Sequence, residues 1–415
     1  MPKSTERIHG LDFIRGIAVL GIFVMNVESF SYPAPFKPAA YGFEVPLDHE
    51  VRFWVYWLFQ GKFFGVFALL FGVGFDIFLS NLEKRGLGLQ SIDVYGRRLL
   101  WLFVFGVVHS IFLWTGDILH HYAICGLLLI PLRSFSQKGI LLSILLLSLV
   151  LFYNDYQRVD SRQTKYQEYQ DAIAVTSENR SAKQNKSIEA WERLIAQPEQ
   201  EFLNDNDPRL GGYWSNFQEN LEHVGFNTGK IFYAGILIRT LILMLVGIWL
   251  YRMQIFQDYR SIKGYWLWTI GVLIVGLLMN YFRSAQWTFH SNEPILSYWR
   301  AWSETLAKEI LATGYVLLLN GVYQKLNQPL TLINKVGKMA LSIYIFQTLQ
   351  GVLFFYGYGM GYYNHFSRSE LLVIILCGWV VQLLVVYWYT KYFTQGPLEY
   401  VWRKLTYREA KTTLL

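Results

Sequence analysis

Apolar residues gather along this chain in about ten long stretches, without alternation of apolar and polar positions. A helix needs about 20 predominantly apolar residues to cross a bilayer, and only helices and closed barrels can span lipid. Barrel strands alternate apolar and polar residues. We therefore predict an all-α, polytopic membrane protein with about ten transmembrane helices, at residues 11–30, 62–80, 97–115, 118–132, 139–153, 230–251, 264–282, 304–323, 338–357 and 370–393.

One long polar segment, residues 154–229, separates the apolar stretches into two groups. It carries charges of both signs and includes stretches compatible with a helix. We predict N-terminal membrane helices in residues 1–153, an extramembrane segment in 154–229, and C-terminal membrane helices with a tail in 230–415. The polar segment is either a folded subdomain or a disordered loop.

Basic residues predict the orientation of the spans. They lie before the first predicted span and after every second one, at Lys3, Arg7, Lys84, Arg85, Arg97, Arg98, Arg133, Lys138, Arg252, Arg260, Lys263, Lys325, Lys335, Lys338, Lys391, Arg403, Lys404, Arg408 and Lys411. Cytoplasmic loops are enriched in Lys and Arg. Both termini are therefore expected in the cytoplasm, and residues 154–229 outside.

Composition supports a membrane protein and narrows its chemistry. Hydrophobic residues make up 53% and charged residues 16% of the chain, whereas soluble domains carry about 25% charged residues. The net charge of +7 fits cytoplasmic loops, so we expect no nucleic-acid partner. Cys125 and Cys377 lie in apolar runs and form no CxxC motif. The chain has no P-loop, GxGxxG, GxSxG or HExxH motif, so we do not expect ATP-driven transport by this chain alone. We also expect no tightly bound cofactor.

Polar residues inside the spans are the candidates for function, because each is costly in lipid. In the first span, Asp12, Arg15 and Asn26 fall on one helix face. Asp12 and Arg15 are spaced to pair, either as an anchor that reaches water or as a buried ion pair that shapes an anion site. Asn26 either lines that site or hydrogen-bonds a neighbouring helix.

The third span begins with Arg97 and Arg98 and carries His109 in its outer half. Arg98 and His109 are eleven positions apart and share a helix face. A histidine in an apolar helix is either a structural hydrogen-bonding residue or a proton-transfer group, since a neutral imidazole suits both.

The turn at residues 114–122 is the densest polar constellation, with Asp117, His120 and His121. Asp117 is suited to cap the following helix or to orient a nearby histidine. The spacing also matches a zinc site, but no third ligand is clearly placed, so no metal is expected. In the second span, Lys62 lies at the outer interface, and Gly72 and Gly74 suggest close helix packing.

Several motifs resemble the bacterial YeiB-like family, known as domain of unknown function 418. They include Leu11-Asp12-x2-Arg15-Gly16, Lys62-Phe63, Gly116-Asp117-Ile118-Leu119-x2-Tyr122, Val336-Gly337-Lys338-Met339-Ala340-Leu341-Ser342-x-Tyr344-x2-Gln347 and Gly396-Pro397-Leu398-Glu399. The resemblance covers nearly the whole chain in order. It implies a multi-pass protein of the bacterial plasma membrane.

The family is similar in turn to transmembrane acyltransferases, namely the acyltransferase-3 group and the heparan-α-glucosaminide N-acetyltransferase. This similarity implies an acyltransferase-like bundle and an acyl-coenzyme A co-substrate. The acyltransferase-3 pattern has a histidine late in the first helix, where this chain has Asn26. Tyr122 and Gln347, which belong to the shared motifs, complete the expected substrate-binding set.

We therefore expect a membrane acyltransferase that moves an acyl group from a cytoplasmic acyl-coenzyme A to an extracytoplasmic glycan, lipid or small-molecule acceptor. Arg15, Arg97 and Arg98 would bind the donor phosphates, and His109 with Asp117 would take a proton from the acceptor. The alternatives are a transporter of a small amphipathic solute and a non-catalytic membrane partner protein.

Overall fold

The computed structural model of the protein describes residues 8–33, 42–195, 207–233, 235–290, 294–326 and 331–407. Within these ranges the chain is helical and contains no strand. Its helices are α1 (His9–Ser31), α2 (Pro46–Leu58), α3 (Lys62–Lys84), α4 (Gln90–Phe112), α5 (Leu119–Leu128), η1 (Ile130–Leu132), α6 (Gln137–Ile173), η2 (Ser177–Asn179), α7 (Ala182–Ile195), α8 (Tyr213–Tyr233), α9 (Ile236–Arg252), η3 (Tyr259–Ser261), α10 (Tyr265–Phe289), α11 (Tyr298–Thr305), α12 (Ala307–Leu326), α13 (Thr331–Lys338), α14 (Ala340–Phe355), α15 (Arg368–Tyr389) and α16 (Pro397–Thr406).

The prediction of an all-α polytopic membrane protein is confirmed. Each predicted span overlaps an observed apolar helix. In the described part of the chain, six helices are long and apolar enough to cross a membrane, or seven if α13 and α14 are counted as one bent span. The number of ten crossings therefore remains a prediction. Lys3, Arg7, Arg408 and Lys411, used to predict the orientation, lie outside the described residues.

Two predicted segments differ from the observed helices. The predicted span 118–132 holds α5, which has only 10 residues and rises about 15 Å, half of a ~30 Å hydrocarbon core. It therefore does not cross a bilayer alone. The boundary expected at residue 153 falls inside α6, a continuous helix of 37 residues. Residues 196–206, within the expected polar segment, lie outside the described ranges.

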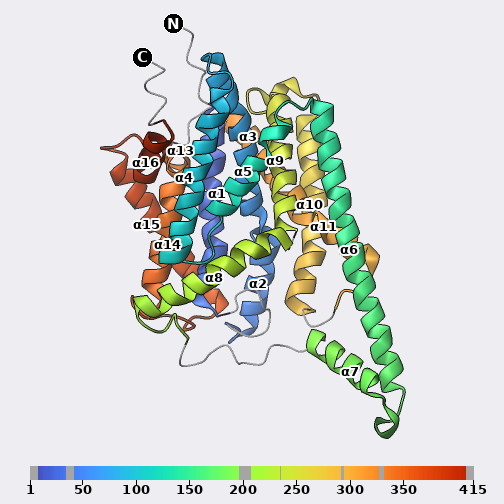
Figure 1. The fold of residues 1–415 in the computed structure, drawn as a ribbon. Helices are drawn as coiled ribbons and strands as arrows, with labels where there is room; N and C mark the ends of the chain where they lie inside the picture. Colours follow the sequence, from blue (N-terminus) through green and yellow to red (C-terminus); the bar gives the residue numbers. More distant parts are fainter. Residues whose placement is uncertain are drawn as a thin grey trace.

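The helices define two ends of the bundle (Figure 1). The start of α1 and α16 lie at one end, which we call the α16 end. The α6–α7 hairpin projects from the other end, which we call the α7 end, and α8 lies across the bundle between them. In the hairpin, Trp191 of α7 is buried against Tyr166 of α6, with ring centroids 4.9 Å apart.

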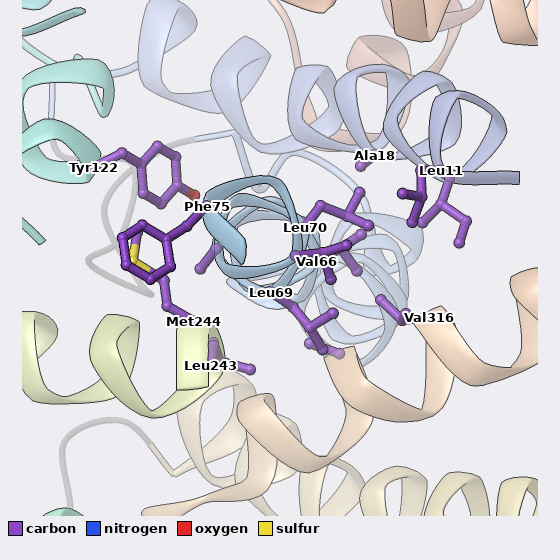
Figure 2. Packing of buried hydrophobic residues seen from close by; sticks show 14 of the residues in the cluster. Leu11, Ala18, Val66, Leu69, Leu70, Phe75, Tyr122, Leu243, Met244 and Val316 are labelled. Atoms are coloured by element: carbon purple, nitrogen blue, oxygen red, sulfur yellow. The ribbon is translucent and has the colours of Figure 1, made fainter. Parts of the chain in front are cut away.

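Helix α3 lies at the centre of the bundle and contacts α1, α9 and α12 (Figure 2). Its glycines allow close contact: a Cβ on Gly72 would lie 1.9 Å from the Met244 carbonyl oxygen of α9. The same is true of Gly247 in α9, whose Cβ would lie 2.0 Å from the Leu69 oxygen. The predicted packing role is confirmed for Gly72 but wrong for Gly74, where only Arg15 lies within 4 Å.

The predicted span 338–357 corresponds to α14, but a short helix that was not predicted, α13, precedes it, and the two meet at Met339 with an 84° bend. Glu399 of α16 caps the first turn of α14 by accepting hydrogen bonds from the backbone N–H groups of Leu341 and Ser342, at 2.8 and 3.2 Å. The Ser342 hydroxyl donates a third bond to Glu399. A carboxylate is favourable at a helix N-terminus, so the Gly-Pro-Leu-Glu segment stabilises the break.

Candidate functional site

A cavity of about 600 Å³ opens at the α16 end of the bundle, where residues of α16 and of the start of α1 line it. This volume lies within the ~300–1,000 Å³ that is typical of small-molecule and cofactor sites. Its wall is formed by residues of α1, α3, α4, α5, α9, α13, α14 and α16, together with the connections between them. The cavity therefore lies where the broken helix α13–α14 meets the first half of the chain.

The mouth of the cavity is basic. Five cations line it, namely Arg15, Lys84, Arg85, Arg98 and Lys338, against two carboxylates, Asp12 and Glu399. The predicted pairing of Asp12 with Arg15 is confirmed, since Arg15 Nη1 lies 3.3 Å from Asp12 Oδ1. The Arg15 side chain keeps 31% exposure. An excess of cations around an open cavity favours an anionic ligand.

The adjacent arginines of α4 point to different places. The Arg98 guanidinium lies 3.7 Å from the centroid of the Trp402 ring and 5.1 Å from that of Phe78. Its planar face is therefore stacked between aromatic residues on the cavity wall. Arg97 is not part of this wall and donates to Asp93 at 2.8 Å. Only one of the two predicted phosphate-binding arginines of α4 therefore faces the cavity.

The inner part of the cavity is aromatic and ends near the turn that follows α4. Tyr122 lines it and stacks on Phe64 and Phe71, while its hydroxyl donates to the Phe64 carbonyl oxygen at 2.8 Å. Tyr344 lines it from α14, and its hydroxyl has no hydrogen-bond partner among the described residues. The Tyr344 ring lies 5.3 Å from the His109 ring, so it separates the cavity from that histidine.

His109, Asp117 and Thr348 form a buried hydrogen-bonded chain. His109 Nδ1 lies 2.8 Å from Asp117 Oδ1, and His109 Nε2 lies 2.9 Å from Thr348 Oγ1. His109 is 2% and Asp117 7% exposed. A carboxylate only accepts hydrogen bonds, so it holds the proton of His109 on Nδ1. The lone pair on Nε2 then points toward the Thr348 hydroxyl of α14, which also lies 3.4 Å from the Tyr344 carbonyl oxygen.

Asp117 joins two histidines, and the local fold explains how. Its second oxygen lies 2.7 Å from His120 Nδ1 and accepts the His120 backbone N–H at 3.1 Å, so Asp117 also caps the start of α5. Gly106 permits this, because a Cβ there would lie 2.6 Å from Asp117 Oδ2. His120 Nε2 is buried without a partner among the described residues. His121 points elsewhere, with Nε2 2.8 Å from Thr240 Oγ1.

The other predicted site residues lie away from the cavity. Gln347 donates to the Val19 carbonyl oxygen and to Gln382, so it links α1, α14 and α15. The Nδ2 atom of Asn26 is buried and has no hydrogen-bond partner in the described ranges. Lys62 is fully buried toward the α7 end, where its Nζ donates to the Tyr56 carbonyl oxygen at 2.6 Å. It does not reach the surface as an interfacial lysine would.

Sequence reasoning missed Lys338, Tyr344, Thr348 and Glu399 as site residues. All four lie in or beside the broken helix, and three of them line the cavity. Tyr344 and Glu399 drew attention only as members of the shared motifs, Lys338 also as a cytoplasmic basic residue, and Thr348 not at all. Among the described residues, no group of three His, Cys, Asp or Glu side chains is arranged to hold a metal ion.

Comparison with known proteins identifies a set of full-length relatives. Residues 250–409 match the family model described as "Protein of unknown function (DUF418)". The chain is 30% identical to the "Uncharacterized protein YeiB" of Escherichia coli (strain K12), over 98% of this chain and 97% of that protein. It is 27% identical to the "Uncharacterized protein YxaH" of Bacillus subtilis (strain 168), over 97% and 95% of the two chains. No solved structure matches.

Proposed function

This chain belongs to the YeiB-like DUF418 family, and from that premise we propose that it is a membrane acyltransferase. One observation carries the proposal. The basic cavity at the α16 end extends inward to Tyr344, whose ring contacts His109 of a buried Asp–His pair. The side chain of Tyr344 thus lies between a site suited to a polyanion and a candidate proton acceptor, His109. Transfer of an acyl group from a negatively charged donor needs both.

The donor is an acyl-coenzyme A, and the α16 end is its cytoplasmic entrance. The phosphates bind at the mouth, where Arg98 and Arg15 supply planar guanidinium groups that match phosphate oxygens. Lys84, Arg85 and Lys338 add positive charge. The aromatic wall between the mouth and Tyr344 accommodates the pantetheine arm and the acyl group. The basic residues of this end give the bundle its orientation in the bacterial plasma membrane, with both termini in the cytoplasm.

The reaction joins the acyl group to a hydroxyl or amine of an extracytoplasmic glycan, lipid or small molecule. The acceptor attacks the thioester carbonyl carbon, a new C–O or C–N bond forms, and the C–S bond breaks. His109 Nε2 takes the acceptor proton and returns it to the coenzyme A thiolate, while Asp117 stabilises the imidazolium. For this step the acceptor takes the position of the Thr348 hydroxyl at Nε2.

A transporter is the second candidate, and the break between α13 and α14 favours it. Discontinuous helices near the membrane midplane mark the binding sites of many transporters. Here the break lies beside Lys338 at the basic mouth, and Glu399 caps the free end of α14. The N–H groups of Leu341 and Ser342, which would otherwise face a solute, are already satisfied. The break as such is typical of a transporter, but because these N–H groups are already capped by Glu399, we rank the transporter second to the enzyme.

Calorimetric titration of the purified protein with acetyl- and long-chain acyl-coenzyme A tests the proposal. We expect saturable binding that free coenzyme A competes away. In proteoliposomes that also contain an acceptor, release of the coenzyme A thiol should follow. If no acyl-coenzyme A binds, the proposal loses its donor and is wrong. Binding and vectorial export of an intact solute, without thioester cleavage, would instead support the transporter.

A further inference from the structure

The α7 end of the bundle contains two buried arginines, Arg52 of α2 and Arg368 at the start of α15. Arg52 is 0% and Arg368 2% exposed. Both guanidinium groups lie against the ring of Phe43, with Cζ atoms 6.0 and 4.7 Å from its centroid. Tyr56 flanks Arg52 at 4.2 Å, and Tyr32 flanks Arg368 at 5.1 Å. The two cations thus share one aromatic enclosure.

The hydrogen-bonding capacity of this pair is almost unused. None of the six guanidinium nitrogens of Arg52 and Arg368 has a hydrogen-bond partner among the described residues. Aromatic faces attract a cation but accept no N–H bond of normal strength. Buried charged groups are ordinarily both paired and hydrogen-bonded, because burial of an unpaired charge is costly. Arg368 has a carboxylate at ion-pair distance, whereas the guanidinium nitrogens of buried Arg52 still need an acceptor.

The nearby carboxylates do not supply it. Glu28 Oε2 lies 3.1 Å from Arg368 Nη1, so Glu28 balances the charge of Arg368. Asp48 is fully buried, but its oxygens accept the backbone N–H groups of Glu44, Val45 and Ser369. These bonds also tie the start of α2 to the start of α15. Within the described residues, Arg52 has no carboxylate at ion-pair distance.

We propose that Arg52 and Arg368 form a second binding site, which holds an oxyanion, either a phosphate or a carboxylate group, of an extracytoplasmic ligand. Paired guanidinium forks match the planar carboxylate and the tetrahedral phosphate through bidentate bonds. Arg52 supplies the uncompensated charge. Glu28 balances the charge of Arg368, and Asp48 fixes the start of α2 against the start of α15. The site is distinct from the cavity at the α16 end, and it does not depend on acyl transfer.

A series of aromatic ring contacts leads from this site toward His109. Phe30, two residues before Tyr32, packs on Trp114 with ring centroids 4.6 Å apart. Trp114 in turn lies 6.4 Å from His109, edge to face. An anionic group bound by Arg52 would therefore place the rest of its ligand on the α7 side of His109, opposite the basic cavity. In an acyltransferase this ligand is the acceptor.

Binding of inorganic phosphate and of acetate to the purified full-length protein tests the site, with sodium chloride used to hold ionic strength constant. We expect at least one of the two oxyanions to bind and to raise the midpoint of thermal unfolding, whereas chloride alone does not. Arg52→Gln should weaken that binding about 10- to 100-fold, as expected for the loss of charged hydrogen bonds. If phosphate binds and acetate does not, the ligand carries a phosphate group. If acetate binds and phosphate does not, it carries a carboxylate.

Two control variants distinguish this site from other cations. Arg98→Ala alters the basic cavity and should leave the affinity of the Arg52–Arg368 site for the oxyanion unchanged. Arg193→Gln removes an exposed arginine of α7 and should also leave this affinity unchanged. If Arg52→Gln fails to fold, Arg52→Lys keeps the charge without the fork and should lose roughly tenfold in affinity. The proposal is overturned if wild type binds neither oxyanion, if both Arg52 variants that fold bind like wild type, or if Arg98→Ala abolishes all binding.

Discussion

The two ends of the bundle carry positive charge in different surroundings. At the α16 end, Arg98 and Arg15 line a cavity of about 600 Å³, and Arg15 stays partly exposed. At the α7 end, Arg52 and Arg368 are enclosed by Phe43 and two tyrosines. The first arrangement suits a large ligand that enters and leaves. The second suits a small charged group, because few water molecules remain to compete for the guanidinium groups.

The difference matters because the Asp117–His109–Thr348 chain lies between the two ends. Tyr344 connects it to the cavity, and Trp114 connects it to the enclosed arginines. A reaction centre that receives one ligand from each side needs a proton-transfer group at the meeting point. In the proposed acyl transfer, the open end would be the donor side and the enclosed end the acceptor side, and changes at each end should separate the two functions.

The largest effect is expected at the meeting point. His109→Gln keeps a polar side chain but removes the base, and turnover should fall about 10²- to 10⁴-fold. Steady-state thiol release from acyl-coenzyme A measures this, with acyl-coenzyme A binding as a second readout that should change little. His223→Gln, in exposed α8, is the matched control. Full activity of the His109 variant would reduce His109 to a packing residue and leave His120, whose Nε2 is unpaired, as the candidate base.

The neighbouring arginines of α4 offer a sharper test of the open end. Arg98→Ala should weaken acyl-coenzyme A binding by about 1.5–3 kcal/mol, which is roughly 10- to 150-fold, because charged hydrogen bonds are lost. Arg97→Ala removes the same charge one position away, outside the cavity wall, and should change little. Arg98→Lys should recover only part of the affinity, since it lacks the planar fork. Calorimetry compares all three, and equal losses for Arg97 and Arg98 would contradict a specific phosphate site.

Arg97 and Arg98 also indicate how much of the candidate site can be predicted from the sequence. Hydrophobic periodicity located the apolar helices, and helical spacing correctly placed Asp12 beside Arg15 and suggested an Asp–His couple at Asp117. It assigned Arg97 and Arg98 to one mouth, although adjacent residues point about 100° apart on a helix. Which of the two faces the cavity depends on Trp402, some 300 positions later.

The broken helix could not be predicted from local pattern at all. The mostly apolar run at residues 338–357 predicts one span, which α14 fills, but the run does not show that a second helix, α13, precedes it at an 84° angle. The bend depends instead on tertiary contacts, namely the cap from Glu399 and the close approach of Gly337 to α1. Which side chains of α14 face the cavity and His109 depends on such tertiary contacts, so Tyr344 and Thr348 were not predicted as site residues.

The cavity at the α16 end depends on close packing of α13 against α1. Substitution of two glycines, Gly337 and Gly74, tests this packing. A Cβ on Gly337 would lie 1.7 Å from the Asp12 carbonyl oxygen, whereas one on Gly74, in the cavity wall, would have only Arg15 within 4 Å. Gly337→Ala should therefore destabilise the fold by about 1–3 kcal/mol through overpacking. Gly74→Ala should be neutral or slightly stabilising, because alanine favours helix. Thermal unfolding in detergent compares them, and equal midpoints would argue against a rigid α1–α13 joint.

The smallest effect concerns Glu399, which lies in α16 beyond the last predicted span. Burial raises the pKa of Glu399, and its hydrogen bonds to Ser342 and Leu341 oppose the rise only in part. Because the folded pKa exceeds the unfolded value, this group contributes stability that is complete below the unfolded pKa and is lost as pH rises through the folded pKa. The thermal midpoint of wild type should therefore decline over that interval relative to Glu399→Gln, which cannot ionise.

Glu399→Ala removes the cap of α14 altogether and should lower the free energy of unfolding by about 0.5–2 kcal/mol at every pH. Glu399→Gln keeps an acceptor oxygen for the α14 N–H groups and should lower it by less. If the glutamine variant shows the same pH dependence as wild type, Glu399 is not the titrating group, and its burial does not favour the protonated form.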